Sequence, residues 1–484
     1  MFEALKSQAA RMFGYDGAET STRRRTISSS LSHEDVQANH AHRKILQANA
    51  QDLMRNFAIA KWAIQKHLDY VTAFTFQARS SDTGFNSEVE RFIDSISVQS
   101  EFDVAGRHRL CKSVRLSEAC RVVNGDHGWM KVVKPGPFSA TGSRGFIQMI
   151  ESDLIRTPGD IEPVKTEWFN GVHVARSGAA IEYGLHRREG RMYKFDRLVP
   201  ARNIYLHAWY DRFDQVRGIS PLAAALNWFR DIYEGFEFAL AKIKIGQLFG
   251  LSFYRGGELS PGLLTGQTTD DGDDEDNAQE KKFKLDLGTG PFIIDNNENE
   301  RAEILESKTP AAETQDFLKL MIHVALRTLD IPYSFFDESF TNFYGSRGGL
   351  IQYLKGCRTK IDDNQEVLNW WTRWQLGLAV ADGSLKLPRG MQFNDLKFEW
   401  VADGVPWWDP VKEARGQAMA IAMGATSPQR VCKEIGTDFE TNIDEISEAM
   451  KYARSKNVEL VFADSTAFNP EITTAEPAEV VDAK

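Results

Sequence analysis

Apolar residues recur at helical spacing in three long stretches of this chain. The clearest stretch follows Ser220 and Pro221, a pair typical of a helix start, because a serine oxygen caps free backbone N–H groups and proline is tolerated at the first helical position. The apolar seam after it has spacings of three and four through about 25 residues, or roughly 40 Å of helix. A helix of this length must pack lengthwise against another surface. The members of the seam are Leu222, Leu226, Phe229, Tyr233, Phe236, Leu240 and Ile243.

Two further long helices are predicted downstream. One follows Thr309 and Pro310 and covers residues 311–329, and the other begins near residue 347. Residues 330–346 between them are predicted to form an aromatic loop, whose rings a local core cannot all cover without neighbouring subunits. The last helix has a seam of Leu350, Leu354, Cys357, Ile361, Leu368, Trp371 and Gln375, interrupted by polar Asn364.

A tryptophan cluster in this last helix allows two interpretations. Trp370, Trp371 and Trp374 could stack on nucleic-acid bases. Tryptophan at helical spacing beside leucine is more often part of a core or a subunit contact, and we favour that interpretation.

The first half of the chain is predicted to combine a helix pair with a β-rich block. Two helices are expected from about residue 42, with a break after Asn56. From Thr72 to about His207 the pattern changes to short β-rich runs. The segments 125–128, 176–178 and 188–190 contain turn residues and are predicted to join antiparallel strands, so a hairpin turn explains Asp126 and His127 better than an acid–base pair. The predicted strands cover residues 129–133, 146–150, 172–174, 181–183 and 204–206.

Polar segments interrupt this framework. The N-terminal arm is basic and is interpreted as a solvated tail, and the C-terminal end is polar and acidic. Between the first two long helices, β-like pieces at 251–254, 283–287 and 292–294 surround an acidic stretch at 265–282. The spacing of a calcium loop is absent there, so we expect an exposed acidic loop. Its acidic residues are Asp270, Asp271, Asp273, Asp274, Glu275 and Asp276.

Composition excludes several classes of protein. Of 484 residues, 42% are hydrophobic and 26% charged, as in soluble globular proteins, and no apolar stretch approaches the roughly 18 residues that span a bilayer. The net charge of −10 argues against a broad basic surface that grips DNA. The four cysteines are far apart, which suggests neither a zinc site nor a disulfide framework and fits a reduced, intracellular setting.

Motifs for catalysis are missing. The sequence contains no GxxxxGK[ST] phosphate loop, no HExxH pair and no GxSxG elbow. His40 and His42 are two residues apart at a helix start, so they do not share a helical face, and exposed positions are expected for both. We therefore predict no enzymatic activity, no catalytic residue, no cofactor and no metal site.

The order of these parts resembles the portal proteins of tailed bacteriophages, and most closely the lambda-type portal family. Each similar segment is degenerate, and the likeness lies in their shared order. The segments are 47–69, with Arg55 and Asn56 at a helix junction; 170–187, a strand, turn and strand; 199–226, the lead-in to the first long helix; 329–354, the aromatic loop and the following helix; and 407–438, a closing helical pattern.

The resemblance implies an α+β, portal-type elongated subunit with long stem helices, a β-rich wing, a small α/β or β clip insert and a helical crown, assembling as a ring. The implied parts are an arm (1–42), a wing (43–220), a stem helix (221–248), a clip (249–310), a second stem helix (311–329), a tunnel loop (330–346), a long wing helix with strands (347–407), a crown (408–455) and a tail (456–484).

The resemblance also implies a function and partners. Portal proteins form a ring, usually of about twelve subunits, at one capsid vertex, through which double-stranded DNA enters and leaves without sequence-specific contacts. The implied partners are the terminase large subunit, the major capsid and scaffold proteins and the tail adaptor, with no membrane; the chain would be made in the host bacterial cytoplasm and reside in the virion. Alternatives are another ring-forming head-completion or capsid protein, and a soluble enzyme with an unrecognised site.

Candidate site residues follow from this resemblance. The acidic residues of 270–276 would dock the packaging ATPase, the seam of the first stem helix would pack against neighbouring subunits, and Arg347 is the nearest basic candidate for a contact with DNA phosphate. The tunnel-loop residues expected to face DNA are Ser334, Phe335, Phe336, Asn342, Phe343, Tyr344 and Arg347.

Overall fold

The computed structural model describes residues 33–135, 143–159, 168–190, 192–248, 251–255, 300–304, 312–337, 339, 343–405 and 409–458. The chain divides into two compact units, one formed by residues 1–229 and 323–484 and the other by residues 230–322.

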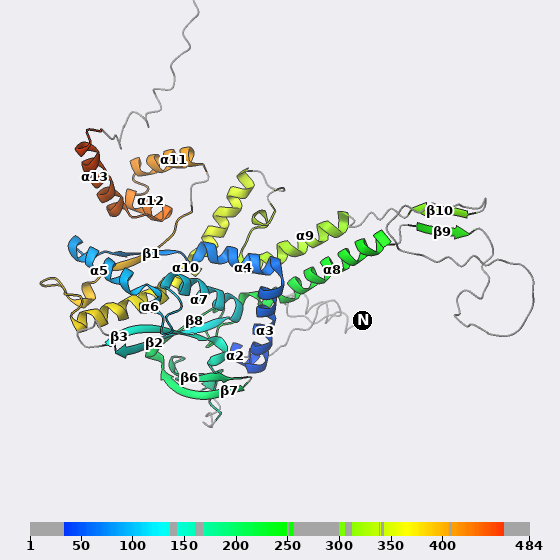
Figure 1. Cartoon of the computed structure of the whole chain (residues 1–484), viewed down its shortest axis with the longest axis horizontal. Coiled ribbons are helices and arrows are strands. Elements are labelled where there is room, and N and C mark those ends of the chain that lie inside the picture. The colour runs from blue at the N-terminus through cyan, green and yellow to red at the C-terminus, as the bar shows by residue number, and fades with distance from the viewer. Residues whose placement is uncertain are drawn as a thin grey trace, which may run out of the picture. The chain divides into compact units, whose positions relative to one another are not determined.

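The first unit is built around an antiparallel three-stranded sheet of order β3-β2-β8. Successive side chains on a strand point to opposite faces, and Trp129 and Met130 of β2 accordingly belong to two different hydrophobic clusters. One face is covered by helices, and the other packs on an antiparallel four-stranded sheet of order β4-β5-β6-β7 (Figure 1). The strands are β2 (Asp126–Pro135), β3 (Ser143–Glu151), β4 (Trp168–Phe169), β5 (Val172–Val174), β6 (Ala180–Glu189), β7 (Met192–Pro200) and β8 (Ile204–Ala208).

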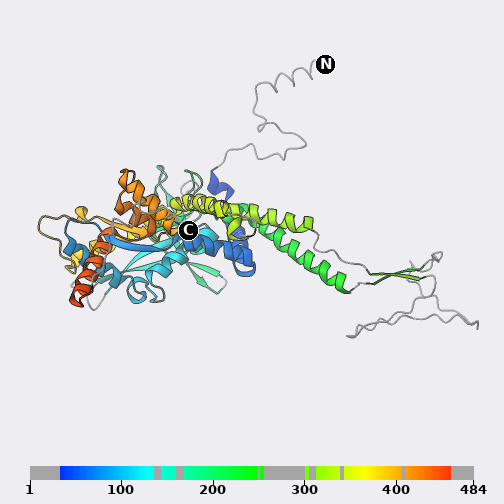
Figure 2. The same ribbon diagram turned by 90° about the horizontal axis from the view of Figure 1, so that it is seen from above.

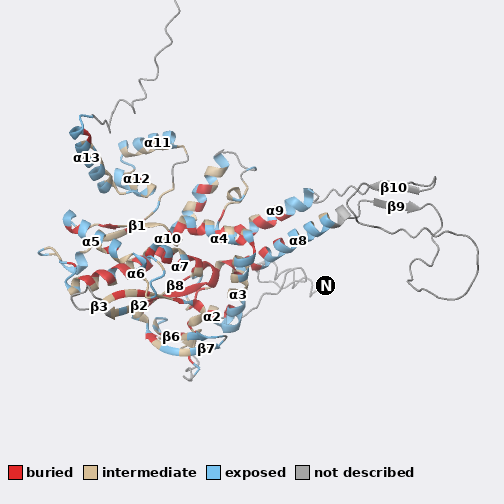
Figure 3. Cartoon of the chain, viewed as in Figure 1, coloured by how far each residue is buried: buried red, intermediate tan, exposed pale blue. Residues whose placement is uncertain are grey.

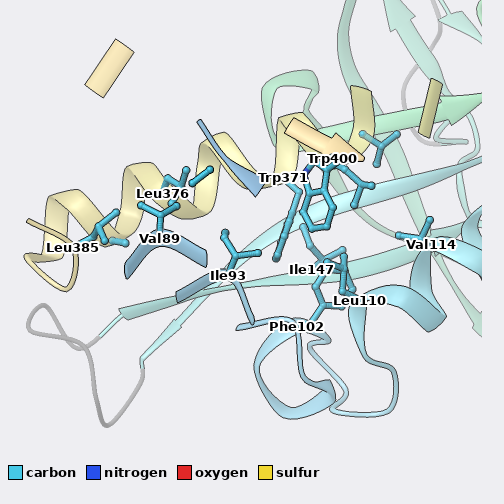
Figure 4. Packing of buried hydrophobic residues seen from close by; sticks show 14 of the residues in the cluster. Val89, Ile93, Phe102, Leu110, Val114, Ile147, Trp371, Leu376, Leu385 and Trp400 are labelled. Carbon is cyan, nitrogen blue, oxygen red and sulfur yellow. The ribbon is translucent and has the colours of Figure 1, made fainter. Parts of the chain in front are cut away.

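The main core lies on the helical side of the three-stranded sheet. Trp371, in the 40-residue helix α10 (Phe343–Asp382), is fully buried there and contacts Phe102 edge-on, with ring centroids 5.5 Å apart (Figure 4). Phe102 in turn contacts Trp129 of β2 at 5.8 Å. The helices that complete this core are α5 (Thr83–Ile96), α6 (Gln99–Phe102) and α7 (Leu110–Asn124), together with β1 (Phe74–Ala78), which pairs antiparallel with β11 (Phe398–Ala402).

Helices also begin and end the described part of the first unit. Near its start lie α2 (Glu34–Gln37), α3 (His40–Asn56) and α4 (Ala58–Val71), with the last two separated at Phe57. Near its end lie α11 (Pro410–Ala422), α12 (Pro428–Ile435) and α13 (Phe439–Ser455). The side chains of Asp409 and Ser427 cap α11 and α12 by accepting hydrogen bonds from backbone N–H groups, as their position before proline predicts.

The second unit contains most of α8 (Leu226–Leu248) and α9 (Ala312–Leu326), and the antiparallel pair β9 (Leu251–Arg255) and β10 (Glu300–Ile304). Two views show α8 and α9 side by side (Figures 1 and 2). They approach closely at Gly235, where an added Cβ would lie 2.8 Å from the Leu318 side chain. Among the described residues, no helix is both long enough and apolar enough to cross a membrane.

Most predicted elements are confirmed, and the chain is α+β as expected. The helix pair with its break after Asn56, the strand runs between residues 129 and 206 and at 251–254, the turns at 176–178 and 188–190, and the burial of Trp371 all occur as predicted. The predicted β-like pieces at 283–287 and 292–294 lie outside the described residues. The serine cap at Ser220 is also present, although the helix begins there as a 3-10 turn (Pro221–Ala224) before α8. The second long helix likewise ends in a 3-10 turn (Arg327–Leu329).

Four predictions about the fold are wrong. Residues 83–124 contain helices α5 to α7 rather than β-rich runs. Buried charged side chains disguise the inner face of α7, whereas α5 buries Phe85, Val89 and Ile93 at a helical spacing that the prediction overlooked. Residues 34–42 of the expected arm are largely helical. The last long helix begins at Phe343, since helical geometry continues through Gly345, Gly348 and Gly349 despite the low helix propensity of glycine. Residues 125–128 are not a hairpin turn: Gly125 ends α7, and Asp126 and His127 are buried in β2.

Candidate functional site

The segment before α10 is anchored by its aromatic rings. Tyr333–Phe335 form a 3-10 turn. The Phe335 ring stacks on Tyr70 of α4 at 5.8 Å and contacts Tyr353 of α10 edge-on at 5.3 Å. The Phe336 ring contacts Trp62 of α4 at 5.6 Å. Aromatic contacts of this geometry stabilise beyond simple burial, so this part of the predicted tunnel loop is held against the fold.

The first turns of α10 carry the remaining described loop residues. Tyr344 is 79% exposed. Arg347 is half-buried, and its Nη2 lies 3.1 Å from Oε1 of Glu413 in α11. Asn342 and the side chain of Phe343 lie outside the described residues. Arg347, the residue predicted to contact DNA phosphate, is therefore paired with a carboxylate.

A groove of about 790 Å³ lies between the end of α9, the segment 330–334 and α10. Ser334 lines it, as do three glycines of α10, Gly345, Gly348 and Gly349. Its charged lining residues are Arg327, Asp330 and Lys355. The predicted loop thus has two sides, with rings packed on α4 and a polar groove beside α10.

The predicted stem seam divides into a buried part and an exposed part. Leu222, Leu226 and Phe229 are buried in the described structure. Tyr233, Phe236 and Leu240 of α8 are 43%, 43% and 51% exposed, and Ile243 is half-buried. The far half of the seam is therefore open in the single chain (Figure 3).

Helix α9 does not cover this open half of the seam. A groove of about 500 Å³ between the two helices is lined by Gly235, Ala239 and Lys242 of α8. Gly235 and Lys242 lie on a different helical face from Tyr233, Phe236 and Leu240, because neither is three or four residues from a member of that set. On α9, Phe317 and Leu320 are 59% and 57% exposed.

The predicted acidic docking loop, with all six acidic residues of 270–276, lies outside the described residues.

A buried carboxylate that the sequence prediction missed fixes the approach to α8. Asp126 accepts hydrogen bonds from Nε and Nη2 of Arg217 at 2.7 and 2.8 Å, from Arg43 Nη2 at 3.1 Å and from the Gly218 N–H at 2.9 Å. Burial alone would raise the pKa of Asp126, but the charges of Arg217 and Arg43 outweigh it and hold that pKa well below its usual range. In the sequence, the nearest indication of this site is the pair Arg217 and Gly218, which comes shortly before the helix-capping Ser220.

A second buried cluster contains two histidines. Ser117 Oγ lies 2.7 Å from His127 Nε2 and 3.1 Å from His207 Nδ1, and it accepts a hydrogen bond from Trp129 Nε1. Burial lowers the pKa of His127 to about 4 despite the nearby carboxylates. All three polar side chains are 3% exposed or less, so no substrate reaches them, and the cluster is part of the packing between α7 and the sheet.

Metal ligands do not gather in the described part of the chain, where no group of three His, Cys, Asp or Glu side chains is placed to hold an ion. His40 and His42 are both exposed, as predicted.

Comparison with known families identifies the chain. The sequence model of the family described as "Phage portal protein, lambda family" matches residues 20–360, more than two thirds of the sequence. The chain belongs to the lambda family of phage portal proteins. The predicted relationship is thus confirmed, and the function is that of a portal protein of a tailed phage or phage-like particle. The portal family is structural rather than enzymatic.

Several solved structures are similar to this chain at low sequence identity. A chain in the virion of a native gene transfer agent particle is 13% identical, with a TM-score of 0.47 over 82% of this chain and 99% of that chain. A chain in the neck of such a particle, computed with C12 symmetry, is 11% identical, with a TM-score of 0.45 over 80% and 93%. A HK97 family phage portal protein from Corynebacterium diphtheriae is 10% identical, with a TM-score of 0.27 over 65% and 83%. No curated protein sequence matches the chain.

Proposed function

We propose that this portal-family chain assembles into a ring of about twelve subunits at one capsid vertex, through which double-stranded DNA is packaged and ejected. The observation that carries the proposal is the pair of exposed apolar surfaces on α8 and α9. Tyr233, Phe236 and Leu240 form one, and Phe317 and Leu320 form the other. Large apolar side chains gathered on one helical face are typical of a surface that a partner covers.

The two surfaces suit neighbours that repeat around an axis. They lie on different helices, so a contact between the α8 surface of one copy and the α9 surface of the next joins two unlike patches. Such a heterologous contact leaves one patch free at each end of a row of subunits and is completed when the row closes into a ring. Burying the exposed half of each of these side chains stabilises the contact by roughly 1 kcal/mol before the cost of association.

Weak contacts with DNA fit the charge of the chain. A net charge of −10 in each subunit disfavours tight phosphate binding and favours sliding. We propose that the loop residues Ser334, Tyr344 and Arg347 approach the passing duplex, and that phosphate contacts Arg347 by replacing Glu413 at its guanidinium. Phe335 and Phe336 then serve to hold the loop in place from α4. Asn342 and Phe343 stay candidates for DNA contact.

The remaining roles of the chain are docking roles. We propose that the acidic residues of 270–276 dock the terminase large subunit, and that the ring also contacts the major capsid and scaffold proteins and later the tail adaptor. In this proposal the chain hydrolyses nothing, because its sequence lacks a phosphate loop. It is made in the host bacterial cytoplasm and ends in the virion.

A charge placed in the open seam tests the assembly. Phe236→Asp should abolish rings, since a buried unpaired carboxylate opposes the contact, while the isolated chain keeps its far-UV spectrum. Ala241→Asp is the matched control, because Ala241 is exposed on the same helix and lies outside the seam. Sedimentation velocity of both variants decides the question. Rings of Phe236→Asp as stable as those of the control would contradict the proposed interface.

A further inference from the structure

We propose that the groove between Arg327 and α10 is a binding site for the phosphate backbone of double-stranded DNA, with Arg327 and Lys355 as its contacting cations. This inference rests on the proposed passage of DNA through the assembled chain. It assigns the contact to two cations, Arg327 and Lys355, that the sequence prediction did not include.

The cations of this groove are not neutralised by carboxylates. Lys355 is exposed, and no acidic side chain in the described part of the chain forms an ion pair with it. Arg327 is also exposed, and its Nε and Nη2 lie 3.3 and 3.0 Å from Nε2 of His323, which is not a carboxylate. The His323 ring stacks on Tyr333 at 5.7 Å, so Arg327 is oriented without losing its charge.

The one carboxylate among the described lining residues is already engaged. Asp330 Oδ2 accepts a hydrogen bond from Lys360 Nζ at 2.8 Å, and the same ammonium group donates to the Gly356 carbonyl. The groove therefore presents positive charge in a chain whose total charge is negative. Charge of this sign in a groove attracts a polyanion, and the attraction is strongest at low salt.

The shape of the groove suits a broad ligand. It is open, with a volume of about 790 Å³, and one wall is the start of α10. A Cβ added at Gly348 would meet nothing within 4 Å, so this wall offers room close to the helix backbone. Ser334 and Gln352 add hydrogen-bonding groups beside the two cations. Backbone contacts of this kind position a duplex without reading its sequence.

Arg347 differs from these groups. It lies near the groove in sequence, but its guanidinium is paired with Glu413. A phosphate must displace a carboxylate to reach Arg347, whereas no carboxylate of the described residues forms an ion pair with Arg327 or Lys355. We therefore expect the groove to contribute more to DNA binding than Arg347 does.

The salt dependence of duplex binding tests the inference. A fluorescent 30-base-pair duplex is titrated with the full-length protein between about 50 and 200 mM salt, and assembly is recorded on the same samples by negative-stain microscopy. The variants are Arg327→Gln, Lys355→Gln and the double change. Arg358→Gln is the matched control, because Arg358 is an exposed cation on α10 that does not line the groove.

The double variant should weaken binding severalfold and lower the slope of log K against log salt by about 2, since each phosphate contact contributes about 0.9. The control should change neither. Equal slopes for all five proteins, the unchanged chain included, would overturn the groove as a DNA site even if rings form. The DNA site would also be overturned if the protein bound a peptide of residues 265–282 but no duplex, and if Arg327→Gln and Lys355→Gln weakened that peptide binding. The groove would then be a site for the acidic loop. If the chain stays monomeric, the ring proposal fails. The same titration on the monomer still shows whether the groove binds DNA.

Discussion

Replacing Asp126 by asparagine should destabilise the fold strongly. The change keeps the size of the side chain and removes its charge. In the native structure this fully buried carboxylate accepts five hydrogen bonds, four from Arg43, Arg217 and Gly218 and one from Ser152 Oγ. An asparagine amide would turn N–H groups toward these donors, and two buried guanidinium groups would lose their counter-ion.

The magnitude follows from this loss. Arg43 and Arg217 are 7% and 2% exposed, so water does not replace the missing charge. Breaking a buried ion pair by removing one partner costs about 3–5 kcal/mol, mainly because the other charge stays buried and uncompensated. Asp126→Asn should therefore lower the free energy of unfolding by about 3–5 kcal/mol near pH 7. Because the native pKa of Asp126 lies below its unfolded value of about 4, this contribution is present above pH 4 and is lost as the pH falls further.

Urea unfolding followed by tryptophan fluorescence and far-UV circular dichroism measures the effect. The unfolding midpoint should fall by about 1 M or more at fixed protein concentration. Asp69→Asn is the control, because Asp69 pairs with Arg115 at 2.7 Å on the surface, where such a pair contributes at most about 1 kcal/mol. Equal midpoints for the two variants would refute the reasoning that Asp126 holds the approach to α8.

Four further results are expected. Burial lowers the pKa of His127 to about 4, so the free energy of unfolding should fall by about 3 kcal/mol through this group between pH 6.5 and pH 4. His127→Gln should flatten that part of the stability profile, and an unchanged profile would contradict this role of His127. Trp371→Ala should cost about 3–5 kcal/mol in urea unfolding and Trp374→Ala clearly less, because only Trp371 is fully buried; equal losses would argue against the described core. Arg347→Ala should reduce DNA retention in packaging assays, and unchanged packaging, retention and channel structure would exclude its phosphate role. Deleting Asp270–Asp276 should weaken terminase docking in a pull-down, and normal docking would leave this loop a spacer.

The elements with periodic apolar residues could be predicted from the sequence. The seam of α10 and the caps before Pro221, Pro410 and Pro428 are local signals, and the structure places helices at each of them. The seam of α8 was equally visible, but periodicity does not tell whether a chain covers its own apolar face. Only the structure shows that Phe229 is buried and Phe236 is exposed.

The misread parts depend on contacts between distant residues. Helix α7 buries Glu118 and Arg121, which form an ion pair at 2.7 Å, so its inward face contains charges that a hydrophobic pattern does not reveal. Asp126 looked like a turn residue because its partners, Arg43 and Arg217, are far away in the sequence. The two cations of the groove, Arg327 and Lys355, were missed for the same reason, since one lies at the end of α9 and the other on α10.

The mass and shape of the purified protein test the central claim most directly. Mass photometry and negative-stain microscopy should show rings with a central hole and a mass of about twelve times the 54.7 kDa of one chain. A stable monomer at every concentration, with no rings even beside scaffold or capsid protein, would contradict the ring assembly proposed for this portal protein.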